Sequence, residues 1–264
     1  MAQRIRFVPV MKWIFLFCER CRLKSGWHRE RYFAPTEENF RRGVFYEGEG
    51  SMKVKICGLR TLEAAQTAER AGADFLGFIL WPKSRRYVSA SQAGSIVQAV
   101  RERAMTVGVV VDQSLEEVVD LARRCRFNAI QLHGHEPPEY AEALRTKADV
   151  RIIKAFRWRD DFSVDGANAY PADYVLLDTF KKGMAGGTGE AFRWREAAEA
   201  TRKLKKPLFL AGGISEANAK EAAQTLSPFA LDVSGSLEED GEKSPEKIRA
   251  FMNAVQDIRN EAAT

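Results

Sequence analysis

Short apolar segments alternate with stretches of helical periodicity along the chain from residue 53 onward. The apolar segments are nearly continuous, which is typical of strands buried on both faces of a parallel sheet. We predict strands at 53–57, 74–80, 106–111, 127–132, 150–155, 173–178, 207–211 and 229–233. We predict helices at 61–71, 90–103, 114–125, 136–147, 159–168, 193–204, 215–225 and 244–260. Eight such β-then-α units, with no second compositional zone, favour one closed (β/α)₈ TIM barrel of the α/β class, with an open doubly wound sheet as the alternative.

Three of the predicted helices carry start signals. Ser114 precedes Leu115 and has Glu117 at the third helical position, which is the pattern of a capping box. Ser215 and Glu216 are expected to open the seventh helix. Ser244-Pro245 is expected to open the last one, because proline suits the first helical position.

Residues 1–51 differ from the rest of the chain in charge. They contain 10 Lys and Arg against 6 Asp and Glu, whereas the remaining residues contain 31 against 30. A near-neutral body argues against a nucleic-acid-binding surface there. Glu47-Gly48 and Glu49-Gly50 imply purine-rich codons shortly before Met52, as in a bacterial ribosome-binding sequence. We therefore expect residues 52–264 to form the barrel domain and residues 1–51 to be a disordered extension outside the fold.

The four cysteines indicate a reducing compartment. Cys18, Cys21, Cys57 and Cys125 are too sparse and uneven for a secreted disulfide framework. Cys18, Cys21 and His28 offer three metal ligands, whereas a structural zinc site takes four, so we expect no metal. The apolar stretch 13–17 lacks a cleavage site for a signal peptide, and the chain has no run long enough to span a bilayer. We expect a cytoplasmic protein that binds no membrane.

Reactive side chains stand where predicted strands end. Cys57 closes the first strand, Arg86 follows the second, Asp178 closes the sixth, and Gly212-Gly213 follow the seventh. Barrel enzymes keep their chemistry in the loops at the carboxyl ends of their strands. A thiol can act as a general base where a site stabilises its thiolate, although a structural core cysteine is the alternative for Cys57 taken alone. A carboxyl group partly removed from water, as expected for Asp178, can keep a proton near neutrality, whereas a turn aspartate is the alternative.

A family resemblance rests on motifs at these strand ends. The motifs are Lys55-Ile56-Cys57-Gly58-Leu59, Pro82-Lys83-Ser84-Arg85-Arg86-Tyr87, Gln131-Leu132-His133-Gly134, Leu177-Asp178-Thr179, Gly186-Gly187-Thr188-Gly189, Ala211-Gly212-Gly213-Ile214 and Asp232-Val233-Ser234. In this order they resemble the phosphoribosylanthranilate isomerases of tryptophan biosynthesis, from Met52 to about Met252. The resemblance implies an Amadori rearrangement of a phosphoribosyl substrate, with Cys57 as general base, Asp178 as general acid and no cofactor.

The resemblance also implies the substrate contacts. Arg86 is expected to bind the anthranilate carboxylate through two parallel hydrogen bonds, whereas Lys83 and Arg85 are expected to be solvated. The further substrate-binding residues are expected to be Gln131, His133, Gly187, Gly212, Gly213, Asp232, Ser234 and Gly235. Ser234-Gly235-Ser236 departs from the Ser-Ser-Gly order of the family. We therefore expect position 235 to contact the phosphate through its backbone only.

Two other functions stay open at this stage. A Schiff-base aldolase could use Lys154 at the end of the fifth strand, if an apolar pocket lowers the pKa of the amine. A binding module could use residues 1–51 as a basic arm for nucleic acid, with Trp13, Trp27 and Tyr32 stacking on bases. We expect the protein to bind a small phosphosugar and no nucleic acid. We expect it to be a monomer or a homodimer.

Overall fold

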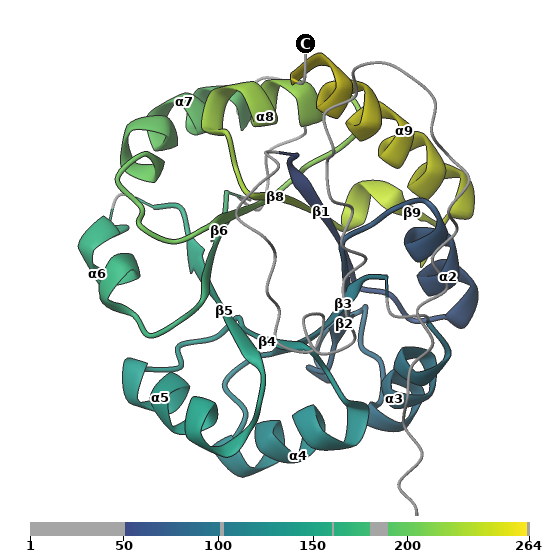
Figure 1. Ribbon diagram of the computed structural model, residues 1–264, viewed down its shortest axis with the longest axis vertical. Helices are drawn as coiled ribbons and strands as arrows, with labels where there is room; N and C mark the ends of the chain where they lie inside the picture. Colours follow the sequence, from purple (N-terminus) through teal and green to yellow (C-terminus); the bar gives the residue numbers. More distant parts are fainter. Residues whose placement is uncertain (1–50, 101–102, 160, 180–189, 263–264) are drawn as a thin grey trace, which may run out of the picture. The chain divides into compact units, whose positions relative to one another are not determined.

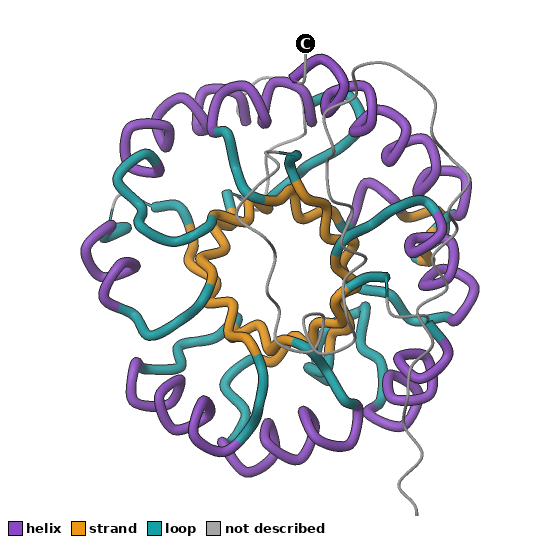
Figure 2. The backbone as a smooth tube through the Cα atoms, viewed as in Figure 1, coloured by secondary structure: helices purple, strands orange, loops and turns teal. Residues whose placement is uncertain are grey.

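The computed structural model describes residues 51–100, 103–159, 161–179 and 190–262. Parallel strands pair in chain order and the first strand also pairs with the last, so the sheet closes on itself. Figure 1 shows these strands as a ring, and Figure 2 shows the helices as an outer layer around it. The strands are β1 (Lys53–Cys57), β2 (Phe75–Ile79), β3 (Met105–Val110), β4 (Ala129–Leu132), β5 (Arg151–Arg157), β6 (Tyr174–Asp178), β7 (Leu208–Ala211) and β8 (Ala230–Val233). The predicted closed barrel is confirmed, and the open doubly wound sheet is wrong.

The outer layer consists of one helix after each strand. The helices are α2 (Leu62–Arg70), α3 (Ala90–Ala99), α4 (Leu115–Cys125), α5 (Pro138–Lys147), α6 (Val164–Ala169), α7 (Glu190–Thr201), α8 (Ala219–Leu226) and α9 (Pro245–Ala262). Among the described residues, no helix is both long and apolar enough to cross a membrane.

The helix start signals had mixed outcomes. Ser114 and Glu117 form the predicted capping box, and α9 begins at Pro245 as expected. The prediction that Ser215 opens a helix is wrong, because α8 begins only at Ala219. The side chain of Asn218 accepts a hydrogen bond from the Ser215 N–H at 2.8 Å, which gives this segment a turn in place of a first helical turn.

Alternate residues of each strand face opposite sides of the barrel wall. One core cluster lies between the barrel and the helices and includes Val54 and Ile56 of β1. The other cluster fills the barrel interior and includes Phe75, Tyr174 and Phe209. Those three rings pack edge to face, with centroids 5.0–6.5 Å apart. This packing fills the barrel interior near the amino ends of the strands. The carboxyl ends of the strands form the open rim.

A short hairpin after β8 was not predicted. It follows the 3₁₀ helix η1 (Gly235–Leu237) and consists of the antiparallel strands β9 (Glu238–Glu239) and β10 (Glu242–Lys243). The turn between them is formed by Asp240 and Gly241, both with positive φ. Strands of two residues carry no periodicity, so the sequence pattern contains no signal for them.

Candidate active site

Cys57 lies on the inner face of the barrel at the end of β1. It alternates with Val54 and Ile56, which face the helices, so its side chain shares the interior with Lys55. Gly77 is its register partner on β2, and a Cβ at Gly77 would lie only 3.0 Å from the Cys57 Sγ. The glycine therefore leaves the space that the thiol fills.

Lys55 is fully buried one layer below Cys57. Its Nζ lies 2.9 Å from Oδ1 of Asp232, its register partner on β8. Burial alone would lower the pKa of Lys55, but Asp232 and the Cys57 thiol outweigh burial and raise the pKa, so the side chain stays an ammonium. The structure places Asp232, a predicted substrate ligand, in this buried ion pair.

The environment of Cys57 acts on its thiol in two directions. Burial raises the pKa of the Cys57 thiol above its ordinary value, and the charge of Lys55 opposes that shift. An isolated buried thiol would lose its proton rarely, and a neighbouring ammonium stabilises the thiolate. The Lys55 ammonium is therefore the feature of the site that favours the thiolate form of Cys57, which is the form that can act as a base.

Asp178 closes β6 and points to the same interior, because it alternates with Leu177, which faces the helices. Its side chain is 25% exposed, and its Oδ2 lies 3.9 Å from the Nε2 of His133. Burial lowers the pKa of His133, so the ring is neutral near pH 7. Gln131 donates from Nε2 to the His133 Nδ1 at 2.8 Å, which leaves the ring proton on Nε2, facing Asp178.

Gln131 has a second polar atom at the site. Its Oε1 is buried and has no hydrogen-bond partner among the described residues. A buried acceptor without a partner costs free energy in the unliganded protein. A ligand hydroxyl could satisfy it, so the structure is compatible with the predicted role of Gln131 in substrate binding.

Arg86 lies in the loop after β2, against the loops after β1 and β8. A Cβ at Gly58 would lie 2.6 Å from the Arg86 Cδ, and a Cβ at Gly235 would lie 3.2 Å from its Nη2. The guanidinium donates to the carboxylate of Glu238 through Nε and through Nη2, the latter at 3.1 Å. Gly235, where the family pattern expects serine, therefore leaves space for the Arg86 head group.

The loops after β7 and β8 lie next to each other. Gly212 and Gly213 both have positive φ, +97° and +78°, which turns the chain sharply after β7. The Ser236 hydroxyl donates to the Ile214 carbonyl at 2.6 Å and joins the two loops. The Ser234 hydroxyl donates to the Cys57 carbonyl at 2.9 Å. Four predicted substrate-binding residues, Gly212, Gly213, Ser234 and Gly235, are thus grouped at one side of the rim, whereas the predicted Gly187 lies outside the described residues.

Lys154 lies on the other face of its strand. It alternates with Ile153, which belongs to the interior cluster, so it points toward the helices. Its Nζ lies 2.7 Å from the buried carboxylate of Glu136 and donates to the Gly134 carbonyl at 2.7 Å. A lysine that faces away from the rim and is paired with a carboxylate does not have the free amine that a Schiff-base aldolase needs.

Three residues of this region, Lys55, Glu238 and Lys243, were not predicted from the sequence as site residues. Lys55 could have been found, because it is a charge inside an apolar strand, two positions before Cys57 and on the same face. Glu238 and Lys243 lie on the hairpin and had no detectable signal in the sequence.

Among the described residues, no group of three or more His, Cys, Asp or Glu could bind a metal ion. The three candidate ligands Cys18, Cys21 and His28 lie outside the described residues.

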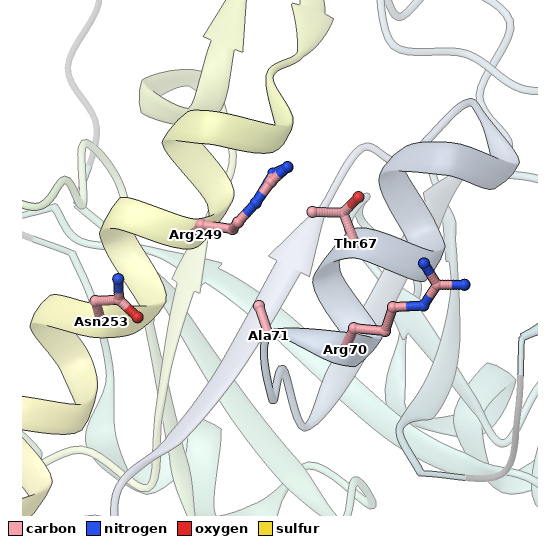
Figure 3. Close-up of a pocket in the computed structure, with 5 residues that line it drawn as sticks. All are labelled: Thr67, Arg70, Ala71, Arg249 and Asn253. Atoms are coloured by element: carbon pink, nitrogen blue, oxygen red, sulfur yellow. The ribbon is translucent and has the colours of Figure 1, made fainter.

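A cavity of about 360 Å³ lies elsewhere, on the outside of the barrel between α2 and α9 (Figure 3). Its lining consists of Thr67, Arg70, Ala71, Arg249 and Asn253. None of these is a predicted site residue. They belong to the outer helices α2 and α9 and to the end of α2, so the cavity is separate from the rim described above.

Comparisons with known proteins show the family to which this chain belongs. Residues 54–254 match the family model of N-(5'-phosphoribosyl)anthranilate (PRA) isomerase. The N-(5'-phosphoribosyl)anthranilate isomerase of Geobacter sulfurreducens is 42% identical over 206 residues, which cover 78% of this chain and 98% of that protein. The enzyme from Bacillus cereus strain AH187 is 35% identical over 201 residues, covering 76% of this chain and 96% of that protein.

Solved structures of the same enzyme are also similar. The phosphoribosyl anthranilate isomerase of Thermus thermophilus has a TM-score of 0.69 and 39% identity, over 78% of this chain and 99% of that one. A phosphoribosyl anthranilate isomerase in complex with reduced 1-(o-carboxyphenylamino)-1-deoxyribulose 5-phosphate has a TM-score of 0.68 and 31% identity, with the same coverage. The chain therefore belongs to the N-(5'-phosphoribosyl)anthranilate isomerase family.

Proposed function

We propose that this chain carries out the reaction of its family with Cys57 as general base and Asp178 as general acid. The reaction is the Amadori rearrangement of N-(5-phosphoribosyl)anthranilate to 1-(2-carboxyphenylamino)-1-deoxyribulose 5-phosphate, a step of tryptophan biosynthesis. The observation that supports these roles best is that both side chains end parallel strands of one closed barrel and face its interior. An acid and a base at one rim can act on the ring oxygen and on C2 of one bound sugar, the two atoms bonded to C1 at which the acid and base steps take place.

The acid acts first in this mechanism. Protonated Asp178 gives its proton to the ribose ring oxygen while the bond from that oxygen to C1 breaks. The nitrogen lone pair forms a double bond to C1, and the product is an open-chain Schiff base. The neutral His133 ring lies beside the acid, with its Nε2 3.9 Å from the Asp178 Oδ2, and does not compete for the role.

The base completes the rearrangement. The Cys57 thiolate removes the proton from C2, and the electron pair forms a C1–C2 double bond while the nitrogen regains its lone pair. The resulting enolamine tautomerises to the ketone, with C1 gaining a proton and the C2 hydroxyl losing one. The substrate gains one proton from Asp178 and loses one to Cys57, and the two side chains return to their starting states by proton exchange with solvent. The Lys55 ammonium below Cys57 favours the thiolate that this step needs.

Substrate binding completes the proposal. The Arg86 fork binds the anthranilate carboxylate, because a planar guanidinium matches it with two parallel bonds. Gly212, Gly213, Ser234 and Gly235 surround the phosphate, at a place where TIM barrels often bind one. Gln131 and His133 contact the sugar, and Asp232, also expected to bind substrate, holds the Lys55 ammonium below Cys57. Purified protein should consume N-(5-phosphoribosyl)anthranilate in an assay that follows the fluorescence of the substrate, and no consumption would refute the proposal.

Changing Arg86 to lysine should raise the Michaelis constant clearly, whereas Arg85→Lys should leave it nearly unchanged. Lysine keeps the charge of Arg86 but loses the fork. Arg85 also contacts Glu238, but its side chain is 67% exposed, and exposed ion pairs contribute little. Steady-state kinetics on both variants is the measurement. Equal behaviour would mean that the wrong one of two adjacent arginines has been chosen.

Residues 52–264 are proposed to be the catalytic domain, with residues 1–51 outside the fold. The family match begins at residue 54, and the closed barrel leaves no sheet edge for a further strand. A chain starting at Met52 should melt at the same temperature and turn over at the same rate as the full chain. Differential scanning fluorimetry and the fluorescence assay measure this. Aggregation, or a melting temperature lower by several degrees, would contradict it.

A cytoplasmic location and a monomeric or homodimeric state remain predictions. Among the described residues, Cys57 and Cys125 are free thiols. Size-exclusion chromatography with light scattering would give the oligomeric state directly.

A further inference from the structure

The carboxylate of Glu238, at the start of the β9–β10 hairpin, receives three cations. Arg85 Nη2 lies 2.7 Å from Oε2, and Lys243 Nζ lies 2.9 Å from Oε1. Arg86 uses two nitrogens, Nε to Oε1 and Nη2 to Oε2. The side chains of Glu238 and Lys243 are only 8% and 2% exposed. Glu238, Lys243 and the Arg86 head group therefore form a largely buried network, whereas Arg85, whose side chain is 67% exposed, pairs with Glu238 from the surface.

The network also connects the hairpin to the catalytic rim. Lys243 donates to the Ser234 carbonyl at 3.1 Å, and the Ser234 hydroxyl donates to the Cys57 carbonyl at 2.9 Å. Burial alone would raise the pKa of Glu238, but the hydrogen bonds from Arg86 and Lys243 reverse this and lower the pKa, so the carboxylate stays ionised.

The way Glu238 binds Arg86 leaves one part of the guanidinium available. A guanidinium has a side edge, formed by Nε and one terminal nitrogen, and an end edge, formed by the two terminal nitrogens. Glu238 occupies the side edge through Nε and Nη2. The end edge keeps one N–H on each terminal nitrogen, which is the geometry of a second, parallel carboxylate fork.

Charge favours a second carboxylate at this place. A single arginine between two carboxylates would leave them to repel each other. Here Arg85 and Lys243 add two positive charges to the pair of Arg86 and Glu238. The cluster therefore has a net positive charge before substrate binds, and an incoming anion is attracted.

We propose that Glu238 is a positioning residue that binds the side edge of the Arg86 guanidinium and aims its end edge at the substrate carboxylate. This inference rests on the proposed role of Arg86. The other end of the hairpin strengthens the arrangement, because Arg60 pairs with Glu242 and donates from Nη1 to the Arg85 carbonyl at 3.1 Å. Both ends of the hairpin thus restrain the loop that contains Arg86.

The test compares two ligands on the same variants. One ligand is reduced 1-(o-carboxyphenylamino)-1-deoxyribulose 5-phosphate, and the other is the same compound without its aromatic carboxyl group. Glu238→Gln should weaken binding of the first ligand by about 10-fold to 100-fold, the range of a hydrogen bond to a charged group, and of the second by less than about 2-fold. Glu239→Gln, a change of the exposed neighbouring acid on β9, is the matched control and should alter neither. Dissociation constants from fluorescence titration provide the measurement.

A second variant guards against misfolding. Glu238→Gln leaves Lys243 buried without its carboxylate, so its melting temperature is measured alongside. If that variant does not fold, Glu238→Asp decides, because it keeps the charge but withdraws the carboxylate by one methylene. It should show a smaller loss with the same selectivity for the carboxylated ligand.

The other outcomes overturn the inference in distinguishable ways. Equal weakening of both ligands, or of neither, would mean that Glu238 has no role in aiming Arg86. If Arg86→Lys loses the carboxylated ligand selectively and the Glu238 variants do not, only the inference fails. If Arg86→Lys shows no selectivity either, the proposed role of Arg86 fails and the inference fails with it.

Discussion

Replacing Cys57 with serine should lower kcat by about 10²- to 10⁴-fold, the usual contribution of a positioned acid or base. A serine hydroxyl fits the space beside Gly77, but it ionises far less readily than a thiol, so the Lys55 ammonium could not produce a comparable base. The Michaelis constant should change little, because the binding groups Arg86 and the glycine loops are untouched. Steady-state kinetics with N-(5-phosphoribosyl)anthranilate would measure both parameters.

Cys125→Ser provides the matched control for this experiment. Cys125 is also buried and free, but it lies on α4, packed among helices, and its Sγ donates to the Ala90 carbonyl at 3.2 Å. A serine there can keep the hydrogen bond, so turnover should stay near normal. Near-normal turnover in Cys57→Ser itself would refute the base assignment.

Changing Asp178 to asparagine should also lower kcat by about 10²- to 10⁴-fold, because an amide has no proton to give to the ribose ring oxygen. Asparagine is nearly isosteric with aspartate, so the Michaelis constant and the melting temperature should stay close to those of the unchanged protein. Asp161→Asn, an exposed change in the loop after β5, is the control and should be silent. Both variants are compared by steady-state kinetics.

His133 decides how a different outcome would be interpreted. Its Nε2 lies 3.9 Å from the Asp178 Oδ2, so it is an alternative proton donor close to the proposed acid. Burial lowers the pKa of His133, and a neutral imidazole is a poor acid near pH 7. Near-normal turnover in Asp178→Asn would therefore mean that Asp178 is not the general acid. It would also leave His133 as a candidate, against the expectation that a neutral ring is a poor acid.

The barrel, and the places of Cys57 and Asp178 at its rim, followed from the sequence. Continuous apolar segments alternating with helical periodicity can bury both faces of each strand only under a layer of helices. Once the sheet is parallel and closed, all carboxyl ends meet at one rim, so Cys57 and Asp178 had to lie at the same end. The resemblance to the isomerase family, resting on seven local motifs, needed no tertiary information either.

The predicted starts of two helices were wrong, because side-chain hydrogen bonds to the backbone decide where these helices begin. Ser215 looked like a helix start, but the Asn218 side chain accepts its N–H and α8 begins later. The sixth predicted helix spanned 159–168, whereas α6 begins at Val164, after Ser163 caps it. Side chains three residues away decide such starts, and periodicity does not report them.

Only the tertiary structure decided which charges meet. Lys55 of β1 pairs with Asp232 across 177 residues, and Arg86, after β2, pairs with Glu238 across 152, since closure of the barrel brings the last β/α unit next to the first two. The sequence left Lys154 open as a nucleophile, but the alternation of side chains along β5 places it on the outer face of the barrel, where it pairs with Glu136. A sequence pattern reports how often apolar residues recur, whereas an ion pair depends on the register of strands far apart in the chain. That register exists only once the ring of strands has closed.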